Sequence, residues 1–447
     1  MYLLTNGRVI TRDEGGKGYY EKGAVAYEGT KIVEVGEEAA LRAKYPQAEI
    51  IDARGGVIMP AFINAHTHIY SALARGLSIV GNNPTNFYEV LDGTWWAMDR
   101  KLTLEGSRAS ADALYIDCIK QGVTTIFDHH AAYCEIPGSL FQIGESAKKF
   151  GIRSCLCYEV SDRDGEEKCL QAIKENADFI TYCQKQNDPM LAAMFGGHAL
   201  FTISDKTFDR MVEANNGRTG YHIHVSEGMN DVYDSLQNYG RRPVQRLQDH
   251  GILGEKTILG HCIHVNTAEM DIIRETNTMV VNNPESNMGN AIGICPVLQL
   301  YKRGILLGMG TDAYTNDMLE SLKVALCSQR SQNCLPNVGW CEVTDMLFKN
   351  NAKIGARYFP DQLGVLKAGA AADIIVMDYK PFTPFSDENI DGHMIFGMTG
   401  RQCQTTIAAG KVLMKDRVLV NIDEEAENAH ILEAAKKLWG DLNHRVY

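Results

Sequence analysis

Two histidines, His66 and His68, stand two residues apart in the segment NAHTH, where a run of apolar residues ends. In a β-strand this spacing directs both imidazoles to the same side, and converging imidazoles are ligands for Zn²⁺ or Fe²⁺. A single pair of this kind is more often two polar residues at a strand end. His224, His261 and Asp312 end later apolar runs in the same way, and together these residues favour a metal site.

The strands and helices that must position these residues are expected to alternate along the chain. Over residues 60–360, short β-like runs alternate with helix-like stretches, which predicts an α/β fold with parallel strands. Many runs end in a titratable or amide residue, for example at His198, Asn283 and Asp312. A (β/α)8 TIM-like barrel carries its chemistry at the C-terminal ends of all its strands, whereas a doubly wound sheet gathers it at one switch point. The pattern therefore favours the barrel.

Both ends of the chain differ from this middle part. Residues 1–59 and 361–422 consist of short alternating runs joined by Gly-containing turns, a pattern typical of β-strands. We expect the two ends to pair into one composite β-sandwich domain beside the barrel of residues 60–360. Residues 423–447 are expected to contain a C-terminal helix that Asp423 caps and Gly440 ends.

The composition excludes several classes of protein. A net charge of -12 argues against a nucleic-acid surface, which needs concentrated Lys and Arg. No apolar run is long enough for a membrane span, and the segment MYLLTNGRVITRDEGG has no secretory signal pattern. The 12 cysteines are scattered without a CxxC pair, which indicates reduced thiols in a cytoplasmic protein rather than a thiolate zinc site.

Five motifs together resemble a known group of enzymes. PAFINAHTH, HIHVSE, LGHCIH, NNPESN and MGTDAYTND occur in the order and spacing of the amidohydrolase superfamily. The similarity is greatest to its deaminase and chlorohydrolase branch, with guanine-deaminase-like and triazine-hydrolase-like enzymes. It extends over nearly the whole chain. DHHAAY, the pair WW, SDRDGE and ENIDGHMIFGM resemble more narrowly the SsnA-type aminohydrolases.

The resemblance implies a ligand set for one divalent metal, zinc in the first place and iron as the alternative. The ligands would be His66, His68, His224 and Asp312, which leave a position open for water. His222 shares the strand face with His224, so spacing alone does not choose between them; the family's HxxE pattern, completed by Glu227, selects His224. The fourth strand ends FGGHALF, without the lysine that bridges two metals in other members. We therefore expect a single metal.

The implied reaction is hydrolysis at an electron-poor carbon of a nitrogen heterocycle, a purine, pterin, pyrimidine or triazine-like ring, with release of ammonia. The metal lowers the pKa of bound water and supplies hydroxide. Asp312 would take the proton of that water, Glu227 would protonate a ring nitrogen and then the leaving amine, and His261 would hydrogen-bond the hydroxide or a developing oxyanion. The partners expected are a small heterocyclic substrate and a second copy of the chain in a homodimer, with no nucleic acid and no membrane.

Two other functions compete with this one. The first is a chlorohydrolase, or a hydrolase of substituted amines, acting on a similar ring. Glu227 favours a leaving group that needs a proton, which chloride does not. The second is a non-catalytic scaffold on the same fold. The intact ligand set, with Glu227 and Asp312, argues against a scaffold.

The expected substrate contacts rest on weaker signals. His198 resembles a substrate-contacting histidine after the fourth strand, although the family sequence there is usually GPHSP. Asn283 is equally explained as a residue that shapes its loop. A long segment after the metal strand contains Trp95 and Trp96, and such segments commonly cover the active site. We expect one of the two indoles to face the substrate; burial against a neighbouring helix is an equal alternative.

The segment TIFDHH ends in Asp128, His129 and His130, three potential ligands side by side. The resemblance accounts for the metal ligands without them, so they are interpreted as groups that orient the ligands or form the pocket wall. Adjacent residues of a regular strand point to opposite faces, so at most one of the two histidines should point inward. We expect His129 or His130 to contact the substrate. A metal bound by this segment would contradict the single-metal prediction.

Overall fold

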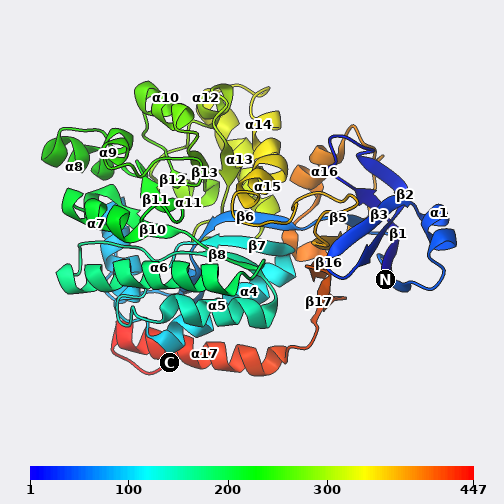
Figure 1. Cartoon of the computed structure of the whole chain (residues 1–447), viewed down its shortest axis with the longest axis horizontal. Helices are drawn as coiled ribbons and strands as arrows, with labels where there is room; N and C mark the ends of the chain where they lie inside the picture. Colours follow the sequence, from blue (N-terminus) through cyan, green and yellow to red (C-terminus); the bar gives the residue numbers. More distant parts are fainter.

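A computed structural model describes all 447 residues. Figure 1 shows a larger part, in which helices surround short strands, and a smaller part formed by a sheet near the N-terminus. The strands of the larger part are parallel, so the predicted α/β class with parallel strands is confirmed.

The parallel strands form two sheets, with the orders β6-β7-β8-β9 and β10-β11-β12-β13-β14. Their bounds are β6 Phe62–Thr67, β7 Val123–Asp128, β8 Arg153–Leu156, β9 Leu191–Ala193, β10 Phe195–Ala199, β11 Tyr221–Val225, β12 Ile258–His261, β13 Met279–Asn282 and β14 Leu307–Met309. Only Met194 separates β9 from β10. Two isolated parallel bridges, Val160 with Gly197 and Thr67 with Asp312, connect the sheets. The strand ends that carry the expected ligands therefore come next to each other.

Helices follow most of these strands and lie outside them (Figure 1). The main ones are α4 Leu104–Gln121, α5 Ser139–Phe150, α6 Glu166–Gln186, α7 Asp205–Asn215, α8 Met229–Tyr239, α9 Pro243–Asp249, α10 Thr267–Glu275, α11 Pro284–Gly289, α12 Val297–Lys302, α13 Met318–Asn333, α14 Trp340–Asp345 and α15 Asn351–Gly355. In α4, Thr103 accepts a hydrogen bond from Gly106 N at the start, and Gly122 ends the helix with a left-handed φ of 79°. A residue without a side chain fits this conformation best.

The strands of both chain ends form one nine-stranded sheet, with the order β18-β17-β16-β15-β5-β1-β2-β3 and β4 beside β1. Their bounds are β1 Tyr2–Ile10, β2 Tyr19–Glu28, β3 Lys31–Glu37, β4 Glu49–Asp52, β5 Val57–Pro60, β15 Ile374–Met377, β16 Cys403–Ala408, β17 Lys411–Lys415 and β18 Val418–Leu419. The two ends meet where β5 and β15 pair antiparallel. Short helices α1 Glu38–Lys44 and α16 Ile390–Gly397 accompany the sheet.

The segment between β6 and α4 contains the short helices η1 Ile69–Ala74, α2 Phe87–Val90, η2 Leu91–Trp95 and α3 Trp96–Asp99. The C-terminal helix, α17 Glu424–Asn443, contacts it: Trp439 donates its indole hydrogen bond to Leu73 O, and Asn443 bonds Ser78 O and Val80 N. Asp423 caps α17 as expected, but the prediction that Gly440 ends it was wrong. The contacts of Asn443 stabilise one further turn.

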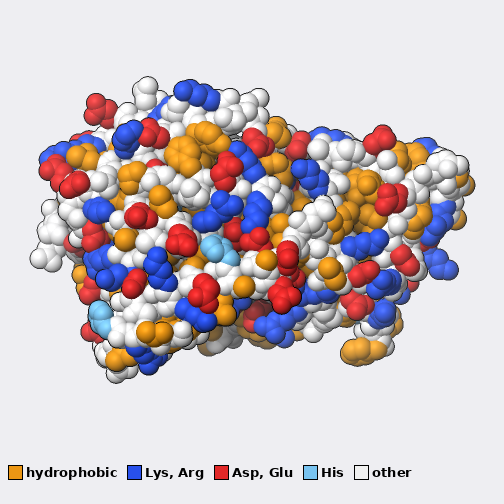
Figure 2. All heavy atoms as spheres, turned by 90° about the horizontal axis from the view of Figure 1, so that it is seen from below, with side chains coloured by type: hydrophobic (Ala, Val, Ile, Leu, Met, Phe, Trp, Pro, Cys, Tyr) orange, Lys and Arg blue, Asp and Glu red, His pale blue; other side chains and the backbone are white.

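Acidic and basic side chains are interspersed on the face shown in Figure 2. This matches a chain whose acids outnumber its bases, with a net charge of -12. None of the helices combines the length and the apolar character that crossing a membrane requires.

Candidate active site

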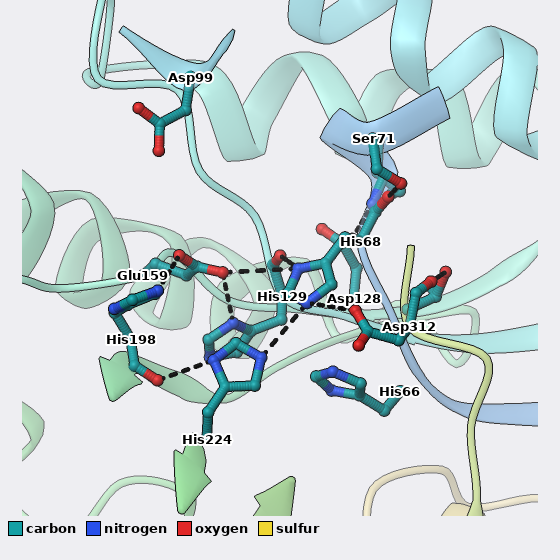
Figure 3. Close-up of polar contacts among 12 residues, drawn as sticks. His66, His68, Ser71, Asp99, Asp128, His129, Glu159, His198, His224 and Asp312 are labelled. Carbon is teal, nitrogen blue, oxygen red and sulfur yellow. Dashed lines mark hydrogen bonds and ion pairs between the residues drawn. The ribbon is translucent and has the colours of Figure 1, made fainter. Parts of the chain in front are cut away.

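Four side chains converge where β6, β11 and β14 end (Figure 3). His68 Nε2 lies 3.0 Å from Asp312 Oδ1 and 3.3 Å from His224 Nε2. The potential ligand atoms of His66, His68 and Asp312 lie within 4.8 Å of one another. All four side chains are buried. The spacing of two residues between His66 and His68 thus brings both rings to one point, because both belong to the end of the same strand.

Hydrogen bonds made by Nδ1 of these histidines, on the side away from the cluster, determine that Nε2 is the nitrogen that faces the cluster. His68 Nδ1 donates to His129 O at 2.6 Å, and His224 Nδ1 donates to His198 O at 2.8 Å. The lone pair of His68 Nε2 therefore lies toward Asp312, and His224 Nε2, also without a hydrogen, lies toward His68 Nε2. His66 Nδ1 lies 2.8 Å from His222 Nε2, and His66 Nε2 is buried without a partner. Three lone pairs and a carboxylate with no hydrogen between them suit a bound cation, and this donor set fits a divalent metal.

The backbone around Asp312 brings β14 close to β6. Thr311 N and Asp312 N both donate to His66 O. Gly310 is required just before them, because a Cβ there would lie 2.7 Å from His66 O. Ser286 donates its hydroxyl to Asp312 Oδ2, which leaves Oδ1 toward the histidines.

Glu227 and His261 lie beside this cluster. His261 Nε2 is 3.5 Å from Glu227 Oε1 and 3.7 Å from Asp312 Oδ2. His261 Nδ1 donates to Asn287 Oδ1 at 2.7 Å, so Nε2 is the nitrogen open to the site. Burial and then the charge of Asp312 raise the pKa of Glu227 well above its usual range. A raised pKa favours the protonated form of the carboxyl, which can act as a proton donor toward the site.

Sequence reasoning missed Glu159, which lies three residues beyond the end of β8. Its Oε1 is 2.8 Å from His129 Nδ1 and 3.5 Å from His68 Nδ1, while Oε2 is 3.8 Å from His198 Nε2. Burial would raise the pKa of Glu159, but the imidazoles of His198 and His129 outweigh it and lower the pKa to about 2. The sequence contained a pattern that could have identified Glu159: the apolar run SCLCYEV, like the other strand-forming runs, has a titratable residue near its end.

The residues of the DHH segment have three different environments. Asp128 Oδ1 accepts a hydrogen bond from Ile69 N at 2.6 Å, which fixes the chain after the metal strand. The His129 ring lies between Glu159 Oε1 and His222 O, 2.9 Å from the latter. His130 is buried with neither ring nitrogen bonded, and burial lowers its pKa to about 3.

A second cluster of potential ligands needs separate mention. It consists of His68, His129, Glu159 and His224, whose ligand atoms lie within 4.8 Å of one another. Both ring nitrogens of His129 are already engaged in hydrogen bonds, and His68 Nδ1 donates to His129 O. No free lone pair of His129 therefore faces this cluster.

A small cavity of about 30 Å³ lies over the convergent side chains, with Glu159, His198, Glu227 and Trp95 in its wall. A larger cavity of about 150 Å³ adjoins it and shares Trp95 and Tyr314. No Lys or Arg lines the smaller cavity.

The other residues that were expected to contact the substrate do not line the smaller cavity. Trp96 packs with its ring centre 5.8 Å from that of His198 and under the guanidinium of Arg163. Asn283 is buried, and neither atom of its amide has a partner. His129 and His130 also lie outside the lining of the smaller cavity.

The chain is similar to known proteins over nearly its whole length. Residues 57–413 match the amidohydrolase family, and residues 23–48 match the imidazolonepropionase-like composite domain of bacteria. The chain is 30% identical to the 5'-deoxyadenosine deaminase of Methanosarcina mazei over 455 residues, which covers 99% of each chain.

Two solved structures share the fold. The adenosine deaminase of Xanthomonas campestris with bound zinc has a TM-score of 0.85 at 22% identity, with 98% of each chain covered. The zinc-containing atrazine chlorohydrolase of Arthrobacter aurescens has a TM-score of 0.80 at 24% identity, with 97% of this chain and 100% of that chain covered. The superfamily and branch suggested by the sequence motifs are confirmed: the chain belongs to the amidohydrolase family.

Proposed function

We propose that this hydrolase of carbon–nitrogen bonds is a metal-dependent aminohydrolase, which removes an amino group from a nitrogen heterocycle and releases ammonia. The observation that carries the proposal is the convergence of three imidazole lone pairs and Asp312 beside Glu227, a buried carboxyl whose pKa is raised. A proton donor next to a hydrolytic metal site is what a leaving amine requires.

The ligands proposed for the metal are His66, His68, His224 and Asp312. Zinc is preferred and iron is the alternative, since imidazole and carboxylate suit both. A bound divalent metal would supply Lewis-acid chemistry, lowering the pKa of a water molecule toward neutrality.

The protein's own groups then direct the protons. Glu227 gives its proton to the ring nitrogen beside the attacked carbon, regains a proton from Asp312, and then gives that proton to the departing amine. Asp312 takes the proton that the attacking water gives up. His261 Nε2, held by the bond from Nδ1 to Asn287, faces both carboxylates and can hold a proton between them. Two carboxylates with different protonation states can thus act as base and acid in one reaction.

The substrate lies, in this proposal, in the small cavity against Trp95 and His198, which line it. His129, His130, Trp96 and Asn283 stand outside that lining and support the wall. A chloride leaving group is the alternative, but it makes no use of the Glu227 proton. The Methanosarcina relative is named for a purine nucleoside, which makes purines the first rings to test. Dimerisation stays a prediction.

The finer architecture is also part of the proposal. The bridges of Val160 with Gly197 and Thr67 with Asp312 support closure of the two parallel sheets into a (β/α)8 barrel over residues 60–360. The pairing of β5 with β15 supports one composite β domain of residues 1–59 and 361–422, with 423–447 as a C-terminal helical segment; that this domain is a β-sandwich stays a prediction.

The experiment combines metal analysis with product analysis. Purified protein is analysed for bound metal, stripped with a chelator and reloaded with Zn²⁺ or Fe²⁺. Ammonia and chloride release are measured over purines, pterins, pyrimidines and triazines. Metal-dependent ammonia release is expected; chloride release without ammonia would support the alternative, and bound metal without any turnover would contradict catalysis on such rings.

A further inference from the structure

Two hydrogen-bond acceptors face the small cavity on the side formed by β8 and β10. They are Glu159 Oε2 and His198 Nε2, which lie 3.8 Å apart, and both residues line the cavity. This distance exceeds that of a hydrogen bond. Neither atom has another hydrogen-bond partner in the protein.

The hydrogen bonds of Thr202 decide the role of His198. The single hydroxyl proton of Thr202 goes to Ala199 O at 2.8 Å. Toward His198 Nδ1, at 2.9 Å, Thr202 can therefore only accept, so Nδ1 carries the ring proton. The opposite nitrogen, Nε2, then presents a lone pair to the cavity.

The position of Glu159 is fixed by the His129 ring. Glu159 Oε1 is 2.8 Å from His129 Nδ1, and His129 Nε2 donates to the backbone oxygen of His222. One carboxylate oxygen is thus committed to His129, and the other points toward His198 (Figure 3). The His129 side chain, which does not line the cavity, acts as a positioning group for one that does.

The charge of the cavity wall adds a second constraint. Glu159, Glu227 and Asp312 line it, and no Lys or Arg does. The nearby Arg163 is paired with Asp99 and covers Trp96. An anionic group next to Glu159 would meet this carboxylate without a Lys or Arg to compensate it, which is unfavourable in a buried site.

We propose that Glu159 and His198 bind an N–H-bearing edge of the substrate, such as a second amino group on the ring. This inference rests on the proposed function and narrows it. The preferred substrates are neutral or cationic heterocycles with two amino groups: one leaves at the metal, and the other donates one hydrogen to Glu159 Oε2 and one to His198 Nε2. Rings with a carboxylate or phosphate next to this edge are excluded.

Matched pairs of rings test the proposal. The zinc-loaded enzyme is assayed for ammonia release with 2,6-diaminopurine against adenine, 2,4-diaminopyrimidine against 4-aminopyrimidine, and diaminotriazine against aminotriazine. Loss of a hydrogen bond to a charged group corresponds to about 10- to 100-fold. We expect the wild type to prefer, by kcat/KM, the diamino ring of at least one pair by a factor in this range. In Glu159→Ala the ratio should fall to about one, mainly through KM.

Two controls separate a specific effect from damage to the fold. Glu175→Gln changes another buried glutamate, which accepts bonds from Gly138 N and Leu140 N away from the cavity, and should leave the ratio unchanged. Glu159→Gln keeps the size of the side chain but removes its charge, and should give an intermediate ratio. A ratio that is the same in wild type and Glu159→Ala would overturn the proposal.

A binding measurement distinguishes this proposal from the proposed function. Calorimetry compares 2-aminobenzimidazole with benzimidazole on zinc-loaded wild type and Glu159→Ala. Tighter binding of the amino compound only in the wild type would support the role of Glu159 even if no ring in the panel released ammonia, an outcome that would count against the proposed function alone. Equal binding of the amino compound by both proteins would overturn the role of Glu159.

Discussion

His222 holds one proposed ligand in place without being a ligand, and its removal tests the orientation of the site. Its Nε2 lies 2.8 Å from His66 Nδ1, and both side chains are buried. His66 can offer Nε2 to a metal when Nδ1 carries the proton and His222 accepts it. In His222→Ala this partner is absent, and the ring can rotate or change tautomer.

The expected loss follows from the contact. A buried hydrogen bond of this kind contributes about 0.5–1.5 kcal/mol, and loss of a partner that orients a metal ligand commonly lowers metal affinity by about 10- to 100-fold. That range equals about 1.4–2.7 kcal/mol. Because the backbone oxygen of residue 222 remains, His129 keeps the acceptor of its Nε2.

The assay is a competition titration of Zn²⁺ against a chromophoric chelator, with thermal unfolding as a check of the fold. His264→Ala is the matched control, since His264 bonds the backbone oxygen of Ile292 at 2.9 Å and takes no part in the cluster. It should bind zinc within about twofold of the wild type, well inside the tenfold step that 1.4 kcal/mol represents. A folded His222→Ala protein with unchanged zinc affinity would refute the reasoning.

Three further predictions concern other groups. Glu227→Gln should lower kcat/KM by about 100- to 10,000-fold with metal content unchanged, as measured by ammonia release and elemental analysis; a parallel loss of metal would contradict its role as proton donor. Trp95→Ala should raise KM by about tenfold, because the substrate ring loses the indole on which it stacks. Trp96→Ala should mainly lower the stability of the fold. An unchanged KM in Trp95→Ala would contradict stacking of the substrate on Trp95. Burial raises the pKa of Asp231 to about 7, while an unfolded carboxyl titrates near about 4. The folded chain therefore holds an extra proton, and its free energy of unfolding falls as the pH rises through this window. The Tm of Asp231→Asn relative to wild type should thus rise from about pH 5 to about pH 8, and a difference independent of pH would contradict the assignment.

The convergence of the proposed metal ligands could be predicted from the sequence because part of its signals is local. The spacing of two residues between His66 and His68 places both side chains on one face of a strand. The choice of His224 over His222 came from the family's HxxE pattern, which Glu227 completes. Asp312 became a candidate through the rule that chemistry lies at the ends of parallel strands, and the family resemblance then proposed it as a ligand.

Other parts of the site depend on contacts that spacing does not encode. Glu159 could be identified as a site residue only from the structure, which places it next to His129 and His198. Trp95 and Trp96 are neighbours in sequence, but a turn of helix directs one to the cavity and the other toward His198 and Arg163. The extra turn of α17 beyond Gly440 likewise depends on distant residues that Asn443 bonds.

The hydrogen bonds from His68 to His129 O and from His224 to His198 O have an evolutionary consequence. The proposed metal ligands His68 and His224 are oriented by main-chain oxygens, which every amino acid possesses, whereas the side chains of His129 and His198 make other contacts. Substitution at positions 129 and 198 can therefore change which molecule is recognised while the catalytic apparatus is inherited intact. At the ends of β7 and β10, the main chain and the side chains are thus free to respond to different selective pressures, so specificity can diversify while the proposed reaction is kept.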